Sequence, residues 1–152
     1  MYILRFFIPV MSAALLSCSS GGPLTPAESF NVIKHAVEKN DSEAIVNCLS
    51  ISSIDKISKL TLLIKDMSND QLSILAVKYG YPQEKLKNLK TSDAVYLYFF
   101  SDITGVKLNR YFRESILSID IHGGNASVKT ESGVELDFVR EGPYWKFDLS
   151  GL

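Results

Sequence analysis

The spacing of apolar residues along the chain changes once, near residue 115. Upstream, apolar residues recur every three or four positions, which predicts amphipathic helices; downstream they alternate with polar residues, which predicts half-buried strands. Helices followed by an antiparallel sheet with one apolar face are typical of an α+β fold. We therefore expect N-terminal helices packed on one face of a curved, four-stranded antiparallel meander.

The helical part begins at the sequence Thr25-Pro26-Ala27-Glu28. Thr25 can cap the free backbone N–H groups, Pro26 suits the first helical position, and Glu28 completes a capping box. The apolar face of this helix is expected to carry Phe30, Ile33, Ala36 and Val37. Further helices are expected at about 42–49, 53–67 and 69–79, and a last one after a cap at Thr91-Ser92-Asp93, through 94–100 and ended by Gly105. The last of these also has strong β propensity, because aromatic and β-branched residues fill it.

Four strands are expected at about 115–122, 126–130, 134–139 and 144–149. Paired residues must share a face of the sheet, so the alternation constrains each turn. We expect a two-residue turn at Gly123-Gly124, a three-residue loop that ends at a left-handed Gly133, and a four-residue loop from Arg140 to Pro143. The resulting pairs are Ile121 with Ala126, Ile119 with Val128, Val128 with Leu136, Lys129 with Glu135, Phe138 with Trp145, and Asp137 with Lys146.

This register sorts the strand residues onto two faces. The apolar face is expected to carry Leu117, Ile119, Ile121, Val128, Val134, Leu136, Phe138, Trp145, Phe147 and Leu149. The opposite face is expected to be solvated and to carry Ser118, Asp120, His122, Lys129, Glu135, Asp137, Lys146 and Asp148. Charged residues on the solvated face would form cross-strand ion pairs, each worth well under ~1 kcal/mol.

A short apolar segment precedes the folded part. Residues 6–16 are apolar over a length well below the roughly 20 residues of a membrane-spanning helix. The segment follows Arg5 and is followed by small residues, which is typical of a secretory signal. The residues Leu15-Leu16-Ser17-Cys18 resemble the lipobox of bacterial lipoprotein precursors.

The lipobox resemblance implies a membrane lipid as partner. Cleavage would make Cys18 the first residue, with a diacylglycerol on its sulfur and a further acyl chain on its amino group. The chain would then consist of a signal peptide (1–17), a lipidated cysteine with a tether (18–24) and one α+β domain (25–152). Ser19 after the cysteine favours the outer membrane of the cell envelope over the inner one. The alternative is a secreted protein cut near Ser17, with Cys18 an incidental thiol.

The only other cysteine, Cys48, would have no disulfide partner within the chain if lipid blocks Cys18. It shares a helical face with Ile45 and Leu49, so we interpret it as a buried and inert thiol. A reactive cysteine would need a basic neighbour, and none is evident nearby.

The layout of the domain resembles the cystatin-like α+β roll of the nuclear transport factor two-like superfamily, and within it small bacterial lipoproteins. The resemblance rests on the helix opening at Thr25–Phe30, on Lys39-Asn40-Asp41 before a second helix, and on the terminal strand Gly142–Leu149. It implies a pocket between sheet and helices. Members of the superfamily include enzymes of the ketosteroid-isomerase and polyketide-cyclase kind, and many that only bind ligands or partners.

No residue pattern in the chain points to catalysis, to a metal or to a cofactor. Ser118, Asp120 and His122 are the residue types of a catalytic triad. Residues two apart on a strand, however, stand about 6.6–6.8 Å apart, which is too far for a hydrogen-bonded relay. His35 lies among polar residues of the first helix and has no partner at metal-ligand spacing. A net charge of −1 excludes the basic character of nucleic-acid-binding proteins.

Two groups of residues remain as candidate binding sites. The aromatic residues Tyr96, Tyr98, Phe100 and Trp145 could line a ligand pocket. The basic residues Lys107, Arg110 and Arg113 recur every three positions and could rest on anionic lipid. For both groups, core packing or plain solvation is the competing interpretation.

The favoured hypothesis for function is a noncatalytic module that binds a small apolar ligand or an envelope protein at a membrane. One alternative is an enzyme of the isomerase or cyclase type. It would need a buried carboxylate or histidine from a helix, for which Asp66, Asp93 and Asp102 are the candidates. The other alternative is a structural envelope lipoprotein whose partner docks on the charged sheet face, around Asp120 and Asp137.

Overall fold

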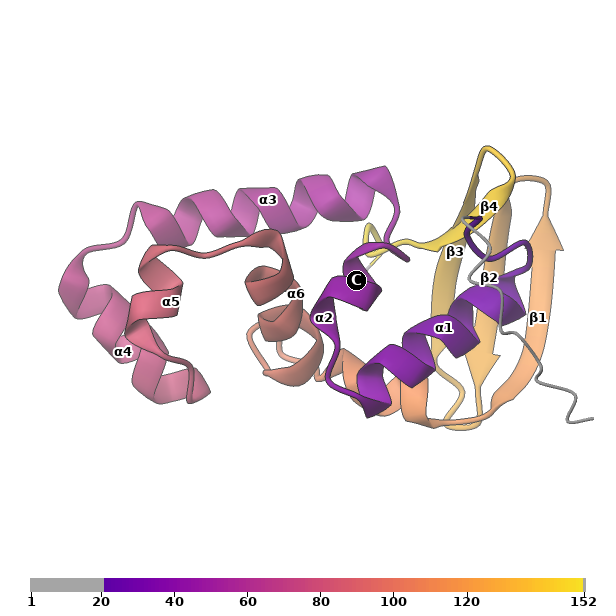
Figure 1. Cartoon of the computed structure of the whole chain (residues 1–152). Coiled ribbons are helices and arrows are strands. Elements are labelled where there is room, and N and C mark those ends of the chain that lie inside the picture. Colours follow the sequence, from indigo (N-terminus) through magenta and orange to yellow (C-terminus); the bar gives the residue numbers. More distant parts are fainter. Residues whose placement is uncertain (1–20, 152) are drawn as a thin grey trace, which may run out of the picture.

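The computed structural model describes residues 21–151, so the predicted signal peptide (1–17) and Cys18 lie outside the described part. The fold is α+β, with helices packed on one face of an open antiparallel sheet whose strand order is β1-β2-β3-β4 (Figure 1). The helices are α1 (Pro26–Glu38), α2 (Ser42–Val46), α3 (Ile51–Lys65), α4 (Asn69–Tyr79), α5 (Gln83–Lys87), α6 (Thr91–Phe100) and the 3₁₀ helix η1 (Leu108–Arg113). The strands are β1 (Ile116–His122), β2 (Asn125–Thr130), β3 (Glu135–Glu141) and β4 (Tyr144–Phe147). None of the helices described has the length and apolar character needed to cross a bilayer.

Helix α1 starts as the sequence predicts. The hydroxyl of Thr25 accepts the N–H of Glu28 at 3.1 Å, and Pro26 occupies the first turn. Phe30, Ile33, Ala36 and Val37 form the buried face of this helix, as expected. The carboxylate of Glu28 departs from the predicted capping box, because it accepts the N–H of Leu24 at 2.7 Å.

Two short elements, α5 and η1, were not expected from the sequence. Each spans at most six residues, too few for an apolar period to show clearly. Helix η1 nevertheless buries Leu108 and Phe112 and packs against α1 and α6. The aromatic segment 94–100, ambiguous in sequence, lies in helix α6.

The first two hairpins have the predicted register. Ile121 pairs with Ala126, and Val128 pairs with both Ile119 and Leu136. The N–H of Thr130 donates to the carbonyl of Val134 at 2.9 Å, so the turn that this bond closes has three residues, 131–133, with Gly133 in the left-handed region at φ 84°.

The predicted register of the third hairpin is wrong by two residues. Phe138 pairs with Phe147 rather than with Trp145, and Lys146 faces Val139 rather than Asp137. The turn contains only Gly142 and Pro143, and Gly142 has φ 60°, which suits the first central position of a type II′ turn. Because a shift of two residues preserves the alternation, Phe138 and Phe147 still share the apolar face.

Strand β1 contains an irregularity that the alternation does not reveal. The register shifts between Ile116, which pairs with Thr130, and Ser118, which pairs with Lys129. The extra residue, Leu117, is 64% exposed, so its predicted place on the buried face is wrong. Ile121, farther along the same edge strand, is 54% exposed although its partner Ala126 is buried.

Aromatic residues from α1, α6, η1 and the sheet meet in the core. Phe112 of η1 lies with its ring centroid 5.1 Å from Phe30, 5.7 Å from Phe99 and 5.0 Å from Phe147. Phe147 in turn contacts Phe138 at 5.4 Å. This cluster joins α1, α6 and η1 to the sheet, which makes η1 central to packing.

The outer edge of β4 is covered by two segments from earlier in the chain. The N–H of Trp145 donates to the carbonyl of Pro23 at 2.9 Å. Farther along, Phe147 exchanges hydrogen bonds with the chain between Cys48 and Ser50, at 2.8 and 2.9 Å. Strand β4 is therefore paired on both sides, whereas β1 forms the open edge of the sheet among the residues described.

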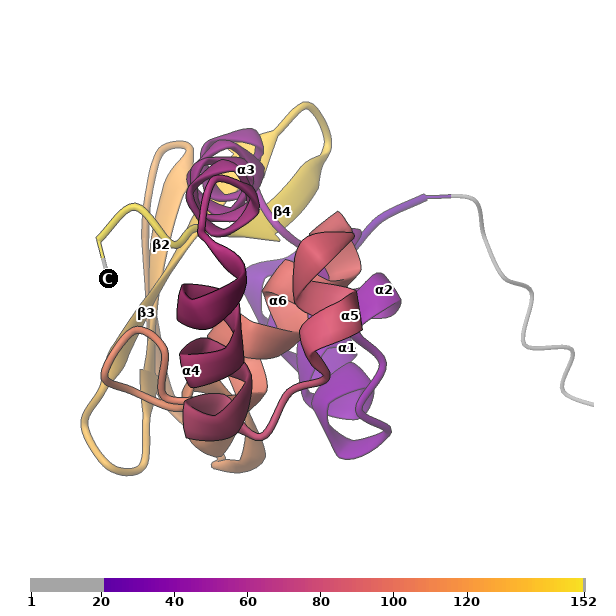
Figure 2. The ribbon, with the colours of Figure 1, turned by 90° about the vertical axis from the view of Figure 1, so that its left-hand side faces the viewer.

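Helices α3 to α5 extend away from the sheet. Figure 1 shows α3 running outward above the core, with α4 and α5 at the end remote from the strands. Figure 2 views this end directly, with α3 seen along its axis and α4 below it.

Candidate functional site

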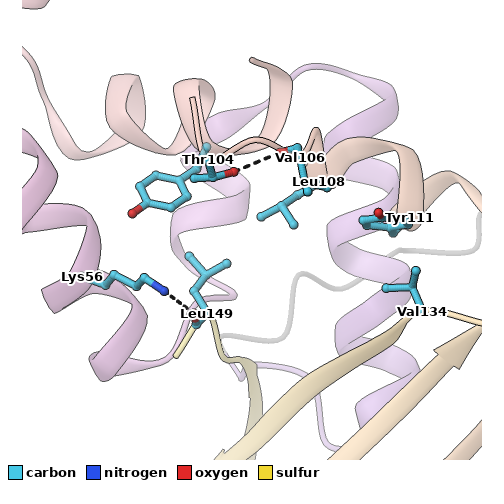
Figure 3. Close-up of a pocket in the computed structure, with 8 residues that line it drawn as sticks. Lys56, Thr104, Val106, Leu108, Tyr111, Val134 and Leu149 are labelled. Atoms are coloured by element: carbon cyan, nitrogen blue, oxygen red, sulfur yellow. Dashed lines mark hydrogen bonds between the residues drawn. The ribbon is translucent and has the colours of Figure 1, made fainter. Parts of the chain in front are cut away.

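An apolar cavity of about 220 Å³ lies between helices α3 and α6, the loop before η1, η1 itself, the end of the β2–β3 loop and the residues after β4 (Figure 3). Its lining consists of Lys56, Tyr98, Thr104, Val106, Leu108, Tyr111, Val134 and Leu149. The cavity is smaller than the roughly 300–1,000 Å³ of pockets for drug-sized ligands. It therefore suits a small molecule or a short apolar chain.

The lining contains few polar side chains, and some of them form hydrogen bonds with the protein. Lys56, the only formally charged lining residue, donates from Nζ to the carbonyl of Leu149 at 2.9 Å. The hydroxyl of Thr104 donates to the carbonyl of Val106 at 3.0 Å. Burial raises the pKa of the Tyr98 phenol, which keeps it neutral. The lining can thus accommodate an apolar body and offer a polar contact at Lys56 or Tyr98.

The four aromatic residues predicted to line a pocket do not share one. Tyr98 lines the cavity, whereas Tyr96 lies in a separate open hollow near Tyr81. Phe100 stacks on Tyr96 with ring centroids 5.0 Å apart, and Trp145 is buried on the sheet. Successive residues of an α-helix are about 100° apart, so positions 96 and 100 share a face that position 98 does not.

None of the three carboxylates required by the enzyme hypothesis lines the cavity. Asp66 and Asp102 are exposed. Asp93 accepts the hydroxyl of Tyr81 at 2.6 Å and the N–H of Lys90 at 3.1 Å. Burial and the bond to Asp93 raise the pKa of Tyr81, so this phenol stays protonated. Asp93 therefore caps α6 and holds Tyr81 in place.

Asp148 is buried, which corrects its expected place on the solvated face. Its Oδ1 accepts hydrogen bonds from the hydroxyls of Ser50, Ser52 and Ser53 at 2.9, 2.6 and 3.2 Å. Burial raises the pKa of this carboxyl, but hydrogen bonds led by those of Ser150, Ser52 and Ser50 outweigh it and lower the pKa to about 2. A carboxylate this weakly basic is a poor general base, and its bonds tie the end of β4 to the start of α3.

The remaining outer sheet face is polar, as predicted. Ser118, Asp120 and His122 are exposed, and Lys129 pairs with Glu135 at 3.4 Å. A shallow hollow of about 310 Å³ lies here, with His122, Asp137 and Asp148 among its lining.

Histidines contribute little to any site in the described part of the chain. His35 lies on the exposed side of α1, with Nδ1 3.2 Å from the carboxylate of Glu38. Within residues 21–151, no group of three His, Cys, Asp or Glu side chains is arranged to hold a metal ion.

The basic residues Lys107, Arg110 and Arg113 are exposed at η1. A 3₁₀ helix has three residues per turn, so residues three apart lie above one another. The three side chains therefore form a basic stripe along η1. The guanidinium of Arg110 lies 5.5 Å from the ring centroid of Tyr111, which lines the cavity.

Cys48 is buried next to the β4 edge, in agreement with its interpretation as an inert thiol. Burial raises its pKa, and the opposing effect of the charge on Lys146 is smaller.

No protein family, no curated protein and no solved structure matches the chain. The likeness to the nuclear transport factor two-like roll therefore rests on the sequence layout. The α+β architecture itself is established by the elements described above.

Proposed function

We propose that this chain is a lipid-anchored protein of the bacterial cell envelope whose domain binds a small apolar ligand without chemical conversion. The anchor is Cys18, in the lipobox-like sequence Leu15-Leu16-Ser17-Cys18. Two or three acyl chains hold a protein on a membrane stably, whereas one chain binds only marginally. The outer membrane is the favoured location, since Ser19 follows the cysteine.

The observation that carries ligand binding is the cavity of about 220 Å³ beside Tyr98 and Leu108. Its walls are apolar, and its polar groups are a phenol kept neutral, a hydroxyl and an ammonium already bonded to a carbonyl. A ligand gains free energy when it buries apolar surface against such a lining. It presents no carboxylate or histidine that could move a proton.

Filling the cavity tests this proposal. Val106 lines the cavity, whereas Val77 lies 83% exposed on α4 and is not part of its lining. Both are partly or largely exposed valines, so Val106→Trp and Val77→Trp are a matched pair. An apolar fluorescent dye, with medium-chain fatty acids as competitors, is expected to bind the wild type and Val77→Trp alike. Its affinity should fall at least about tenfold in Val106→Trp, equivalent to 1.4 kcal/mol. Equal dye binding by both variants would contradict a ligand site here.

The anchor is tested separately, in bacteria that process lipoproteins. Labelled palmitate is expected to enter the wild-type chain and not Cys18→Ala, and the variant should leave the membrane fraction. A Cys18→Ala protein that fractionates as the wild type does would contradict the anchor but leave the cavity proposal standing.

A further inference from the structure

The chain becomes fixed to the sheet very soon after position 18. Gly21 and Gly22 pack against the ring of Tyr144 so closely that an added Cβ would lie 3.1 and 3.0 Å from its atoms. The carbonyl of Pro23 then accepts the N–H of Trp145 at 2.9 Å. From residue 21 onward, the segment before α1 therefore belongs to the edge of β4.

The short stretch between Cys18 and Gly21 limits where the domain can sit. Three residues span at most about 11 Å in any conformation. If Cys18 carries lipid, as proposed above, the part of the sheet next to Gly21 and Tyr144 must lie close to the bilayer surface.

Hydrogen bonds place the two tight turns of the sheet, 123–124 and 142–143, at the same end of the sheet as residues 21–24. We call this end the anchor end and define it as the two turns together with residues 21–24 and Ile51. The backbone N–H of Arg140 donates to the carbonyl of Gly124 at 2.7 Å. Arg140 also pairs with Trp145 between β3 and β4, and the N–H of Trp145 donates to the carbonyl of Pro23. The turns at 123–124 and 142–143 therefore lie level with the point where the tether joins.

The anchor end also carries exposed aliphatic residues. Leu24 is 61% exposed directly after the tether, and Ile51 is 75% exposed. The N–H of Ile51 donates to the carboxylate of Glu141 at 2.7 Å, next to the turn at 142–143. Exposed Ile121 precedes the other turn. Apolar side chains at a membrane surface gain free energy when they enter the headgroup region.

The basic stripe lies at the opposite end of the sheet. Glu114, which follows η1, accepts the N–H of Ser132 in the β2–β3 loop at 3.0 Å. This loop precedes β3, and the seven residues of β3 separate it from the anchor end. At about 3.3 Å per residue, that distance is about 20 Å, roughly twice the reach of the tether.

We propose that the anchor end is the membrane-facing surface, and that it rests on the bilayer with Leu24 and Ile51 in the headgroup layer. The inference rests on acylation of Cys18. The basic stripe then lies away from the lipid, together with the cavity-lining residues Val134, before β3, and Tyr111 of η1.

Fluorescence quenching from the bilayer tests this orientation. The full chain with Cys48→Ala is matured in bacteria, and its intact mass shows whether Cys18 is acylated. Gly124→Cys and Ser132→Cys provide matched labelling sites in turns at opposite ends of the sheet. An added Cβ at Gly124 meets no atom within 4 Å, so the label fits there. Each labelled protein is placed in phosphatidylethanolamine–phosphatidylglycerol vesicles that contain nitroxide-headgroup lipid.

The label at position 124 is expected to lose most of its emission and the label at 132 very little. Inserting a twelve-residue Gly/Ser segment after Ser20, or combining Leu24→Gln with Ile51→Gln, should reduce the difference. Acylated protein that is quenched equally at both sites, or more strongly at 132, overturns the orientation but not the anchor. A chain whose mass shows no acylation overturns both.

Discussion

The hydroxyl of Ser50 donates to the carboxylate of Asp148 at 2.9 Å, although 98 residues separate them. Ser50 also caps α3 by accepting the N–H of Ser53 at 3.1 Å. This bond therefore helps to connect the start of the longest helix to the residue that follows the last strand. Asp148 is negatively charged at the N-terminal end of α3, where the helix dipole stabilises an anion.

This connection predicts a loss of stability in acid. The pKa of Asp148 is about 2 in the folded chain, against an ordinary value of 3.8. Because the pKa is lower in the folded chain than in the unfolded chain, ionised Asp148 stabilises the fold fully above pH 4 to 5. This contribution disappears as the pH falls from about 4 to 2. The contribution is about 2 kcal/mol. We expect the free energy of unfolding, measured in urea, to fall over this pH range. Asp148→Asn should have a lower free energy of unfolding at pH 7, and this free energy should change less between pH 4 and pH 2. An unchanged acid response in Asp148→Asn would contradict the role of the serine hydrogen bonds.

The second prediction concerns the aromatic core. Phe112 is fully buried and contacts three other phenylalanine rings. Truncating a buried phenylalanine typically costs about 3–5 kcal/mol, because a cavity remains. We expect Phe112→Ala to lose this much in chemical denaturation. Val77→Ala, on the exposed side of α4, should change stability by less than about 0.5 kcal/mol. Similar effects for both variants would show that η1 is not part of the core.

The third prediction concerns the fastening of the tether. A side chain at Gly22 must displace the ring of Tyr144, whereas one at Gly124 meets nothing within 4 Å. Gly22→Val is expected to weaken the bond from the Trp145 N–H to Pro23 by about 1 kcal/mol, so that this amide exchanges about fivefold faster with solvent hydrogen. Gly124→Val should leave the Trp145 amide unchanged. Hydrogen-exchange NMR measures both, and equal rates in the two variants would show that the tether is not docked.

The fourth prediction concerns the thiol of Cys48. Burial raises its pKa and hides its sulfur, so a thiol reagent should label it only when the chain unfolds. In a Cys18→Ala background, Cys48 is the single thiol. Labelling is expected to be slow in buffer and complete in urea. Ser58→Cys, on the exposed side of α3, provides a fast-reacting control. Fast labelling of Cys48 in buffer would indicate that the β4 edge opens readily.

Strict alternation made most of the sheet predictable. A slip of one residue would expose Val128 and Leu136 together, so the pairing between β2 and β3 is strongly determined. The third hairpin was less determined, because a shift of two residues keeps Phe138 and Phe147 on the buried face. The sequence did contain the deciding signal, a glycine at position 142 followed by proline, which suits a two-residue II′ turn.

The cavity could not be predicted in the same way. Its lining comes from α3, α6, the segment 104–111, the β2–β3 loop and the residues after β4. No local period relates Lys56 to Val134 or Leu149, since only tertiary packing brings them together. Tyr96, Tyr98 and Phe100 were grouped because they belong to one aromatic run, whereas positions 96 and 100 of helix α6 share a face that position 98 does not. Residues three or four apart share a face of a helix, so a grouping on that basis would have put Tyr98 and Tyr96 on different faces.

If Cys18 carries lipid, as proposed, the irregularity at Leu117 affects how copies of the chain crowd on a membrane. Acyl anchors confine proteins to two dimensions and raise the rate at which exposed strand edges collide. A regular, uncapped edge is a template for strand addition and for growth into fibrils. The bulge interrupts the ladder of β1, the one edge that the chain leaves uncovered in its described part, and makes it a poor template. Close-packed copies can therefore remain separate molecules.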